Sequence, residues 1–240
     1  MNIELKEELK RLAKKIDINI NNEQADKFLK YMDLLLEWNE KINLTAITEK
    51  NEIILKHFID SLTIIKDIPN NSKMLDLGTG AGFPGIPIAI MKDDSQILLV
   101  DSLNKRINFL NIVIENLELE NVKTLHSRAE EIGKNKMYRE KYDIVVSRAV
   151  ANLTVLSEYN LPLVKVGGMG ICMKGPNIEE ELKNSKYAIS ILGGEIDKIE
   201  QCILPDSDIV RNIILIKKKE NTPIKYPRKA GQPVKEPLMK

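Results

Sequence analysis

The order of apolar and polar residues divides the chain into a helical first third and an alternating remainder. In the first third, apolar residues recur at steps of three and four, which is the spacing of one face of a helix. Three such helices are predicted, over residues 4–16, 21–42 and 51–62. We therefore expect an N-terminal helical extension over 1–70, packed on the domain that follows.

From residue 71 onward, short apolar runs alternate with helical stretches, one of them predicted over 153–164. Alternating strands and helices form a parallel sheet, whereas two strands joined by a short turn pair antiparallel. Strands are predicted over 73–78, 96–101, 122–127, 142–149, 167–175, 195–205 and 209–219, and only a short polar turn joins the last two. The pattern predicts an α/β fold over 71–218, with a seven-stranded, mostly parallel sheet and one antiparallel strand. This is the Rossmann-like arrangement of class I methyltransferases that use S-adenosylmethionine, whereas dinucleotide-binding domains usually have six parallel strands.

Four of the twelve glycines lie between residues 78 and 85, directly after the first predicted strand. Residues 80–85 fit the dinucleotide fingerprint G-x-G-x-x-G, and residues 76–82 fit D-x-G-x-G-x-G, the loop that holds S-adenosylmethionine. The carboxylate of Asp76 favours the second interpretation, because it would attract the cationic amino-acid portion of the methyl donor and repel a pyrophosphate. We expect Asp76, Gly78 and Gly80 to belong to a cofactor site for S-adenosylmethionine.

Two further carboxylates follow predicted strands at the same edge of the sheet. Asp101 ends the second strand, where a carboxylate can accept hydrogen bonds from ribose hydroxyls; it can equally cap the helix that follows. Glu130 follows the third strand, where an adenine amino group would lie; it can also simply begin a helix, where its charge is favourable. Both residues support a nucleoside ligand.

Composition limits the cellular setting and the cofactors. No apolar run approaches the roughly 18 residues that a membrane span requires, and the charged N-terminus does not resemble a secretory signal. We therefore expect a cytoplasmic protein with no membrane partner. Cys172 and Cys202 lie in strand-like runs without a C-x-x-C spacing, so we predict neither a metal site nor a disulfide.

The net charge of +1 is the sum of a basic C-terminal end and a mildly acidic remainder. Residues 217–240 contain eight Lys or Arg and two Glu, which gives +6 there and leaves −5 for the first 216 residues. We expect residues 219–240 to form a basic C-terminal arm, either as a solvated tail or as a segment that binds phosphates.

The chain resembles one particular family in motifs spread over nearly its whole length. The matching segments are WNEKINLTAIT, KHFIDSL, LDLGTGAGFPGIPIAI, VDSLNKRINFL, SRAEE, VVSRAV with MKG downstream, and YPRKAGQPVKEPL. Together they resemble RsmG, also called glucose-inhibited division protein B, the bacterial 16S ribosomal RNA guanine-N7 methyltransferases. The GFPGxP turn and the PRKAGxPxKxPL tail are not general features of methyltransferases.

The resemblance implies a reaction, a partner and a set of contacts. A methyl group would pass from S-adenosylmethionine to N7 of a guanine, position 527, in the 530 loop of 16S rRNA. The substrate would be this RNA, either free or within the small ribosomal subunit. Apart from the resemblance, we expect a monomer, because the sequence shows no uncovered heptad repeat or long apolar patch. The cofactor contacts of the family fall on Gly78, Phe83, Ala129, Glu130 and Arg148.

The chemistry of N7 agrees with this interpretation. N7 of guanine carries an in-plane lone pair and no proton, so it can attack the sulfonium methyl group without a general base. The enzyme then has to position the reactants and stabilise charge. We expect Arg148 to lie near the reacting centre and to donate to guanine O6; alternatively, it forms a salt bridge that only shapes the pocket. His57 and His126 are expected to be structural.

Four basic residues are candidates for RNA binding. Lys174 ends the fifth predicted strand, and Arg228, Lys229 and Lys235 are separated by prolines and Gly231 in a segment with little helical tendency. Such a segment is expected to be extended and could follow a phosphate backbone.

Three other functions remain open from the sequence. The same fold and donor could serve a small-molecule or protein acceptor, which the basic arm disfavours. A nucleotide-dependent oxidoreductase is disfavoured by the D-x-G-x-G-x-G spacing and the final pair of strands. A non-catalytic RNA-binding module is disfavoured by the intact glycine loop and its carboxylates.

Overall fold

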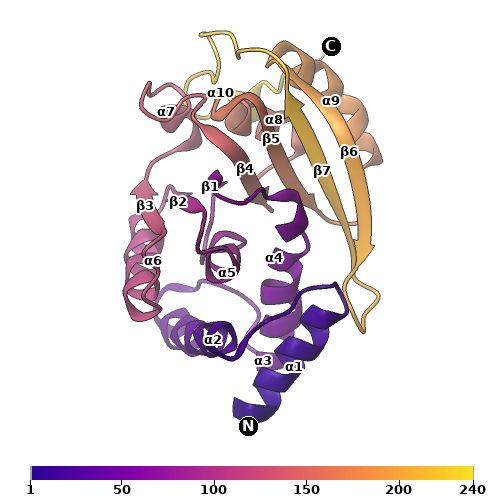
Figure 1. Ribbon diagram of the computed structural model, residues 1–240. Helices are drawn as coiled ribbons and strands as arrows, with labels where there is room; N and C mark the ends of the chain where they lie inside the picture. The colour runs from indigo at the N-terminus through magenta and orange to yellow at the C-terminus, as the bar shows by residue number, and fades with distance from the viewer. Residues whose placement is uncertain (1, 240) are drawn as a thin grey trace.

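The computed structural model describes residues 2–239, which form a seven-stranded sheet flanked by helices (Figure 1). The strand order is β3-β2-β1-β4-β5-β7-β6. The strands are β1 Lys73–Leu77, β2 Gln96–Asp101, β3 Val122–His126, β4 Tyr142–Arg148, β5 Val164–Lys174, β6 Gly194–Ile203 and β7 Val210–Lys218. β7 runs antiparallel to both of its neighbours, and every other pairing is parallel. The predicted α/β fold with one antiparallel strand is confirmed.

The helices of the first third follow the predicted apolar spacing. They are α1 Asn2–Lys14, α2 Asn22–Ile42, α3 Lys50–Ile53, the π-helical turn Ile54–Ile59 and α4 Asp60–Leu62, followed by the 3₁₀ turn Ile65–Asp67. α2 begins where predicted, because the Asn21 side chain accepts a hydrogen bond from the Gln24 amide and caps the helix. The third predicted helix is continuous but changes to π-helical hydrogen bonding in its middle.

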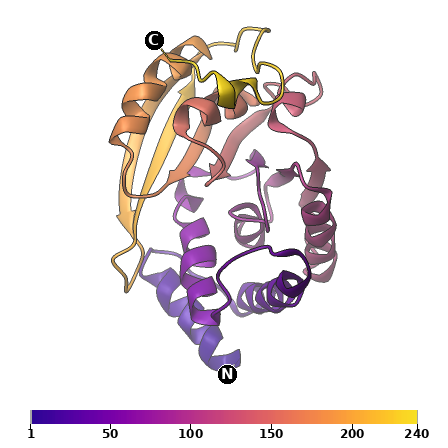
Figure 2. The ribbon, with the colours of Figure 1, turned by 180° about the vertical axis from the view of Figure 1, so that it is seen from behind.

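Helices cover both faces of the sheet. The remaining ones are α5 Gly85–Met91, α6 Asn104–Asn116, α7 Ala129–Ile132, α8 Leu153–Asn160, α9 Glu179–Ile191 and α10 Gln232–Lys235. Figures 1 and 2 show α1, α2, α5 and α6 on one side of the sheet and α7, α8 and α9 on the other. One apolar cluster joins Leu9 of α1, Phe28 of α2 and Phe109 of α6 to Val146 of β4. The helical first third therefore shares a core with the sheet.

One predicted helix boundary is wrong. The helix expected over 153–164 ends at Asn160, and β5 begins at Val164. Pro162 lacks the amide hydrogen that a continuing helix would need. The carbonyl of Leu161 at the helix end instead accepts a hydrogen bond of 2.6 Å from the buried ammonium group of Lys218.

The C-terminal residues are not an extended arm, and in this respect the sequence-based expectation is wrong. They fold back over α7 and α8, and residues 232–235 form the short helix α10 (Figure 2). Arg139 holds this segment through its carbonyls, donating to the Tyr226 oxygen at 2.7 Å and to the Thr222 oxygen at 2.6 Å. Lys240 lies outside the described residues.

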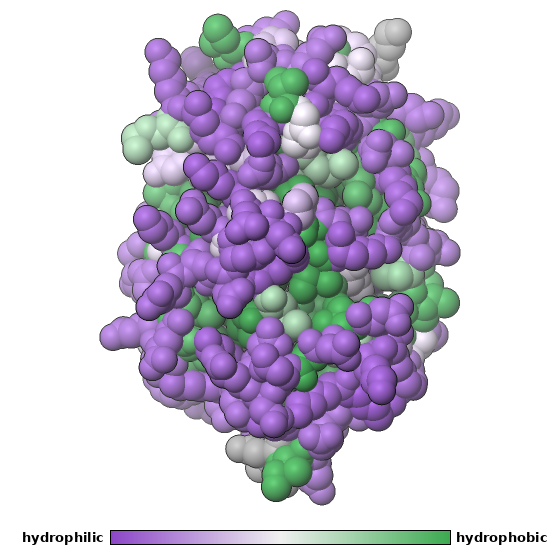
Figure 3. Space-filling view, in the orientation of Figure 1, coloured by the Kyte–Doolittle hydropathy of each residue, from purple (hydrophilic) through white to green (hydrophobic). Residues whose placement is uncertain are grey.

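Figure 3 shows apolar side chains gathered in a hollow across the middle of one face, with hydrophilic side chains above and below it. Within residues 2–239, no helix is long and apolar enough to cross a membrane. The described residues also contain no group of three or more His, Cys, Asp and Glu side chains that could hold a metal ion.

Candidate cofactor site

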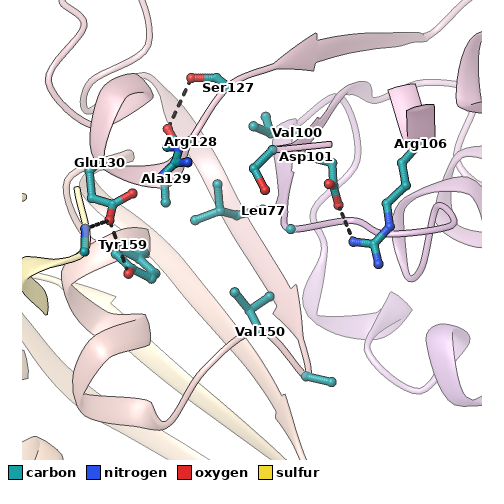
Figure 4. A pocket seen from close by; sticks show the side chains of 14 residues that line it. Leu77, Val100, Asp101, Arg106, Ser127, Arg128, Ala129, Glu130, Val150 and Tyr159 are labelled. Atoms are coloured by element: carbon teal, nitrogen blue, oxygen red, sulfur yellow. Dashed lines mark hydrogen bonds and ion pairs between the residues drawn. The ribbon is translucent and has the colours of Figure 1, made fainter. Parts of the chain in front are cut away.

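A pocket of about 500 Å³ opens at the carboxyl ends of β1, β2 and β3 (Figure 4). Four residues predicted to contact the cofactor line it: Gly78, Asp101, Ala129 and Glu130. Parallel strands bring these residues together although more than 50 positions separate Gly78 from Glu130. The volume lies in the range of small-molecule sites.

Asp101 organises one end of this pocket. Its Oδ2 accepts hydrogen bonds from the Gly80 amide at 2.9 Å and from Arg106 at 3.2 Å. Its Oδ1 accepts one from the Leu103 amide at 2.9 Å, at the start of α6. The carboxylate therefore ties the glycine loop to the start of the next helix while it also lines the pocket, but it does not cap that helix, because the N-cap residue is Leu103 and no side chain caps α6.

The glycine loop allows close approach to the pocket. Gly78 adopts φ +72°, a conformation that residues with a Cβ rarely adopt. A Cβ atom on Gly78 would also lie 2.7 Å from Val150, which follows β4. At Gly78 the loop is thus packed against the β4–α8 connection, with no space for a side chain at that position.

Glu130 faces the pocket from the first turn of α7. Its Oε1 accepts hydrogen bonds from the Gly231 amide at 2.9 Å and from the Tyr159 hydroxyl at 3.4 Å. Burial and the neighbouring Glu130 raise the pKa of Tyr159 to about 12, so the tyrosine is a neutral donor at ordinary pH. Figure 4 shows the second carboxylate oxygen of Glu130 turned toward the cavity.

Asp76 supports the glycine loop through hydrogen bonds that its carboxylate accepts, and it does not line the pocket. Its Oδ2 accepts hydrogen bonds from the Thr79 hydroxyl at 2.7 Å and the Gly85 amide at 2.8 Å, and its Oδ1 is buried without a partner. Burial raises the pKa of Asp76 to about 6, although these hydrogen bonds and the nearby Arg148 act in the opposite direction. A direct contact between Asp76 and the cofactor remains a prediction.

Arg148 and Phe83 also lie outside the pocket lining. The Arg148 guanidinium donates to Asp60 Oδ2 at 3.1 Å and stacks 5.0 Å from the centre of the Phe83 ring. The same ring stacks on His57 at a centroid distance of 4.4 Å, and Nη2 of Arg148 lies 3.4 Å from Nδ1 of His57, so the two groups are neighbours against Phe83. Burial lowers the pKa of Arg148, and the charge of Asp60 opposes this shift. The arrangement is the salt bridge considered as the alternative for Arg148, and its contact with a substrate remains a prediction.

The basic residues predicted to bind RNA differ in how accessible they are. Lys174 pairs with Glu181 at 2.7 Å, and Arg228 pairs with the buried Glu158 at 2.7 Å. Lys229 and Lys235 are exposed, so their ammonium groups are accessible to a phosphate.

Four contributors to the site were missed from the sequence: Asp60, Glu158, Tyr159 and Gly231. Asp60 and Glu158 are acidic residues within largely apolar helical stretches, and that placement was an available signal of a buried ion pair. Nothing in the spacing could have linked Gly231 to Glu130, because 101 positions separate them.

Solved structures with the same fold define the class of protein. M. jannaschii TYW2, solved in complex with AdoMet, matches with a TM-score of 0.54 and 15% identity over 67% of this chain and 76% of its own. A SAM-dependent methyltransferase from Aquifex aeolicus matches with a TM-score of 0.50 and 18% identity over 68% of this chain and 92% of its own. The fold is thus that of the Rossmann-like class I methyltransferases.

Sequence comparison then gives the family. Residues 24–210 match the GidB family, described as rRNA small subunit methyltransferase G. The ribosomal RNA small subunit methyltransferase G of Acetivibrio thermocellus is 58% identical over 92% of this chain and 91% of its own length. The corresponding protein of Clostridium novyi is 52% identical over 95% of this chain and 94% of its own. The chain belongs to the GidB family, which confirms the resemblance seen in its motifs.

Proposed function

We propose that this protein transfers the methyl group of S-adenosylmethionine to N7 of guanine 527 in the 530 loop of 16S rRNA. The observation that carries the proposal is the pocket that places Gly78, Asp101 and Glu130 around one cavity, in a chain of the GidB family. The acceptor atom and the RNA loop rest on the motif resemblance. We further propose that the protein acts in the cytoplasm as a monomer.

The residues of the pocket fit an adenosine group. Leu77, Val100 and Tyr159 provide apolar walls for a purine, and Glu130 offers an acceptor for its amino group. Asp101 has three hydrogen-bond donors on its carboxylate, which leaves acceptor capacity for a ribose hydroxyl. When bound, S-adenosylmethionine would supply the electrophilic methyl group.

The lining of the pocket agrees with a reaction that needs no general base. Its titratable side chains are Asp101, Arg106, Arg128, Glu130 and Tyr159, and the two carboxylates among them are assigned to the ribose and the adenine rather than to the acceptor atom. N7 of guanine brings its own lone pair, so the contribution of the protein is to exclude water and to align the base. Arg148 is assigned here as a positioning residue that fixes Phe83 and the end of β4.

The RNA is proposed to contact the exposed Lys229 and Lys235 in the tail. The segment between Arg228 and Gly231 joins the ion pair with Glu158 to the hydrogen bond with Glu130, so the backbone at Lys229 passes beside the candidate cofactor pocket. We also propose that the chain consists of three parts: a helical extension over 1–70, a methyltransferase core over 71–218 and a basic C-terminal segment over 219–240. Lys174 and Arg228, which are engaged in ion pairs, would contact RNA only if those pairs opened.

The deciding experiment is methyl transfer from labelled S-adenosylmethionine to small ribosomal subunits that lack this modification, followed by mapping of the labelled nucleotide. Label at N7 of guanine 527 is expected. Label at another nucleotide would contradict the acceptor but not the donor. Absence of label with a cofactor-binding protein and competent subunits would contradict the rRNA assignment. Glu130→Gln is the matched variant, since it keeps the shape of the side chain and removes the charge of the proposed adenine acceptor.

A further inference from the structure

The C-terminal segment is fixed to α8 by a buried ion pair next to the pocket. The side chain of Arg228 donates to both carboxylate oxygens of Glu158, from Nε to Oε1 at 3.0 Å and from Nη2 to Oε2 at 2.7 Å. The backbone amide of Arg228 donates to Oε1 of the same carboxylate at 2.7 Å. Glu158 is 1% exposed. A bidentate pair that also includes a backbone amide gives this segment one position and one orientation.

Three residues later, the same segment reaches the pocket. The Gly231 amide donates to Oε1 of Glu130 at 2.9 Å, and Gly231 itself lines the cavity. Gly231 has φ +78°, so the turn that aims its amide at Glu130 uses a conformation that glycine adopts without strain. The tail is thus a wall of the candidate cofactor site.

Both hydrogen-bond donors to the Glu130 carboxylate bond to the same oxygen. The Tyr159 hydroxyl, from the residue next to Glu158 on α8, also donates to Oε1, at 3.4 Å. Figure 4 shows the other carboxylate oxygen of Glu130, Oε2, on the side of the cavity. The carboxylate is therefore held with one oxygen satisfied by the protein and the other available to a ligand.

We propose that the C-terminal tail orients Glu130 to recognise the exocyclic amino group of adenine, with Arg228 as the positioning residue that docks the tail. This inference rests on the proposed use of S-adenosylmethionine. An acceptor that is fixed before the ligand arrives binds without the entropic cost of ordering it. A fixed carboxylate also rejects a ring with a carbonyl oxygen at that place, because two acceptors then face each other.

The test compares two ligands that differ only at this position of the purine. Dissociation constants for S-adenosylhomocysteine and for its inosine analogue are measured by calorimetry, for the wild-type protein and for Arg228→Met. The wild-type protein is expected to prefer the adenosine compound, and Arg228→Met is expected to lose about tenfold of this preference, the size of one hydrogen bond to a charged group. Arg228→Lys, which keeps one charged donor, should restore part of it. Arg11→Met is the matched control, because Arg11 forms an ion pair with Glu8 at the exposed surface.

Equal weakening of both ligands in Arg228→Met would overturn the proposal, because a tail that only supports the fold does not discriminate between them. If Arg228→Met does not fold, Tyr159→Phe removes the second donor to the same oxygen and keeps the ring; about threefold loss of the preference is then expected, and an unchanged preference would overturn the proposal. A wild-type protein that binds neither ligand would contradict the cofactor assignment itself, which is a different failure.

Discussion

The guanidinium of Arg148 in β4 donates to the carboxylate of Asp60 in the helical extension at 3.1 Å, and Arg211 of β7 donates to the other oxygen of the same carboxylate at 2.9 Å. Asp60 is 2% exposed. One buried carboxylate therefore joins the first third of the chain to two strands of the sheet. It also holds Arg148 against Phe83, at the end of the glycine loop.

Replacing Asp60 by Asn should destabilise the protein strongly, because two partly buried guanidinium groups would lose their counter-charge. Breaking such a pair costs about 3 kcal/mol, and we expect a loss of this size in the free energy of unfolding, measured by urea denaturation. Asp26→Asn is the control: Asp26 pairs with Lys6 at the surface, and its loss should cost less than about 1 kcal/mol. Similar losses in the free energy of unfolding for the two variants would show that the ion pairs of Asp60 do not link the helical extension to the sheet.

Tyr31→Phe should weaken cofactor binding although Tyr31 lies outside the pocket. Its buried hydroxyl donates to the carbonyl of Ala81 in the glycine loop at 2.5 Å, so helix α2 fixes the loop. Removing the hydroxyl leaves that carbonyl without this donor and should cost about 1 to 2 kcal/mol of stability. We also expect a severalfold higher dissociation constant for S-adenosylmethionine. Tyr187→Phe, on the exposed face of α9, should change neither quantity.

Gly85→Ala should be among the least tolerated glycine substitutions. A Cβ atom there would collide with Leu99 and would lie 2.8 Å from Oδ2 of Asp76. We expect at least about 2 kcal/mol of destabilisation by denaturant unfolding, because the clash involves a packed β-strand residue. Gly175→Ala, where a Cβ meets nothing within 4 Å, is the matched control. An equal effect of the two changes would contradict the packing described for the start of α5.

The stability of the protein should depend on pH through His57. Burial, followed by the charge of Arg148, lowers the pKa of His57 from 6.5 to about 4. Between these values the unfolded chain binds a proton that the folded protein does not, so stability falls as the pH falls through this window. At pH 4.5, the titration of His57 should lower the free energy of unfolding by about 2 kcal/mol. Comparing unfolding of the wild-type protein and His57→Gln at pH 7 and pH 4.5 isolates it.

His57→Gln should lose less stability on acidification than the wild-type protein. Asp76 acts in the opposite direction, because its pKa in the folded state is raised to about 6 and it takes up a proton on folding between pH 6 and 3.8. Asp76 is present in both proteins, so its contribution cancels in the comparison. Equal acid sensitivity of the two proteins would mean that His57 does not remain neutral in the fold.

Lys229→Gln and Lys235→Gln should each weaken RNA binding without changing cofactor affinity. Each exposed ammonium that neutralises a phosphate contributes close to one unit to the slope of log affinity against log salt concentration. We expect the slope to fall by about one unit for each substitution. Lys183→Gln and Lys186→Gln on α9 change the charge equally at exposed positions and should leave the slope unchanged. If the two control substitutions lowered this slope by the same amount, the protein would attract RNA through its overall charge and not through specific contacts of Lys229 and Lys235.

The sheet and the glycine loop could be predicted from the sequence alone, because both follow from local patterns. Strands and helices differ in the period of their apolar residues, and the cluster from Gly78 to Gly85 follows a strand directly. These patterns were sufficient for the strand number and the antiparallel β7. They were also sufficient for the positions of Gly78, Asp101 and Glu130 at one edge, since the ends of parallel strands meet there.

The partners of the charged groups could be identified only in the three-dimensional structure. An arginine can face RNA or pair with a buried carboxylate in the same local sequence. The residues around Arg148 and Arg228 do not distinguish these two cases. Which of the two occurs depends on Asp60 and Glu158, which lie 88 and 70 positions away. The tail likewise has the prolines of an extended segment, and its docked position depends on carbonyls held by Arg139 and on the Gly231 amide at Glu130. Pairings of this kind depend on long-range packing, and local sequence periodicity carries no information about them.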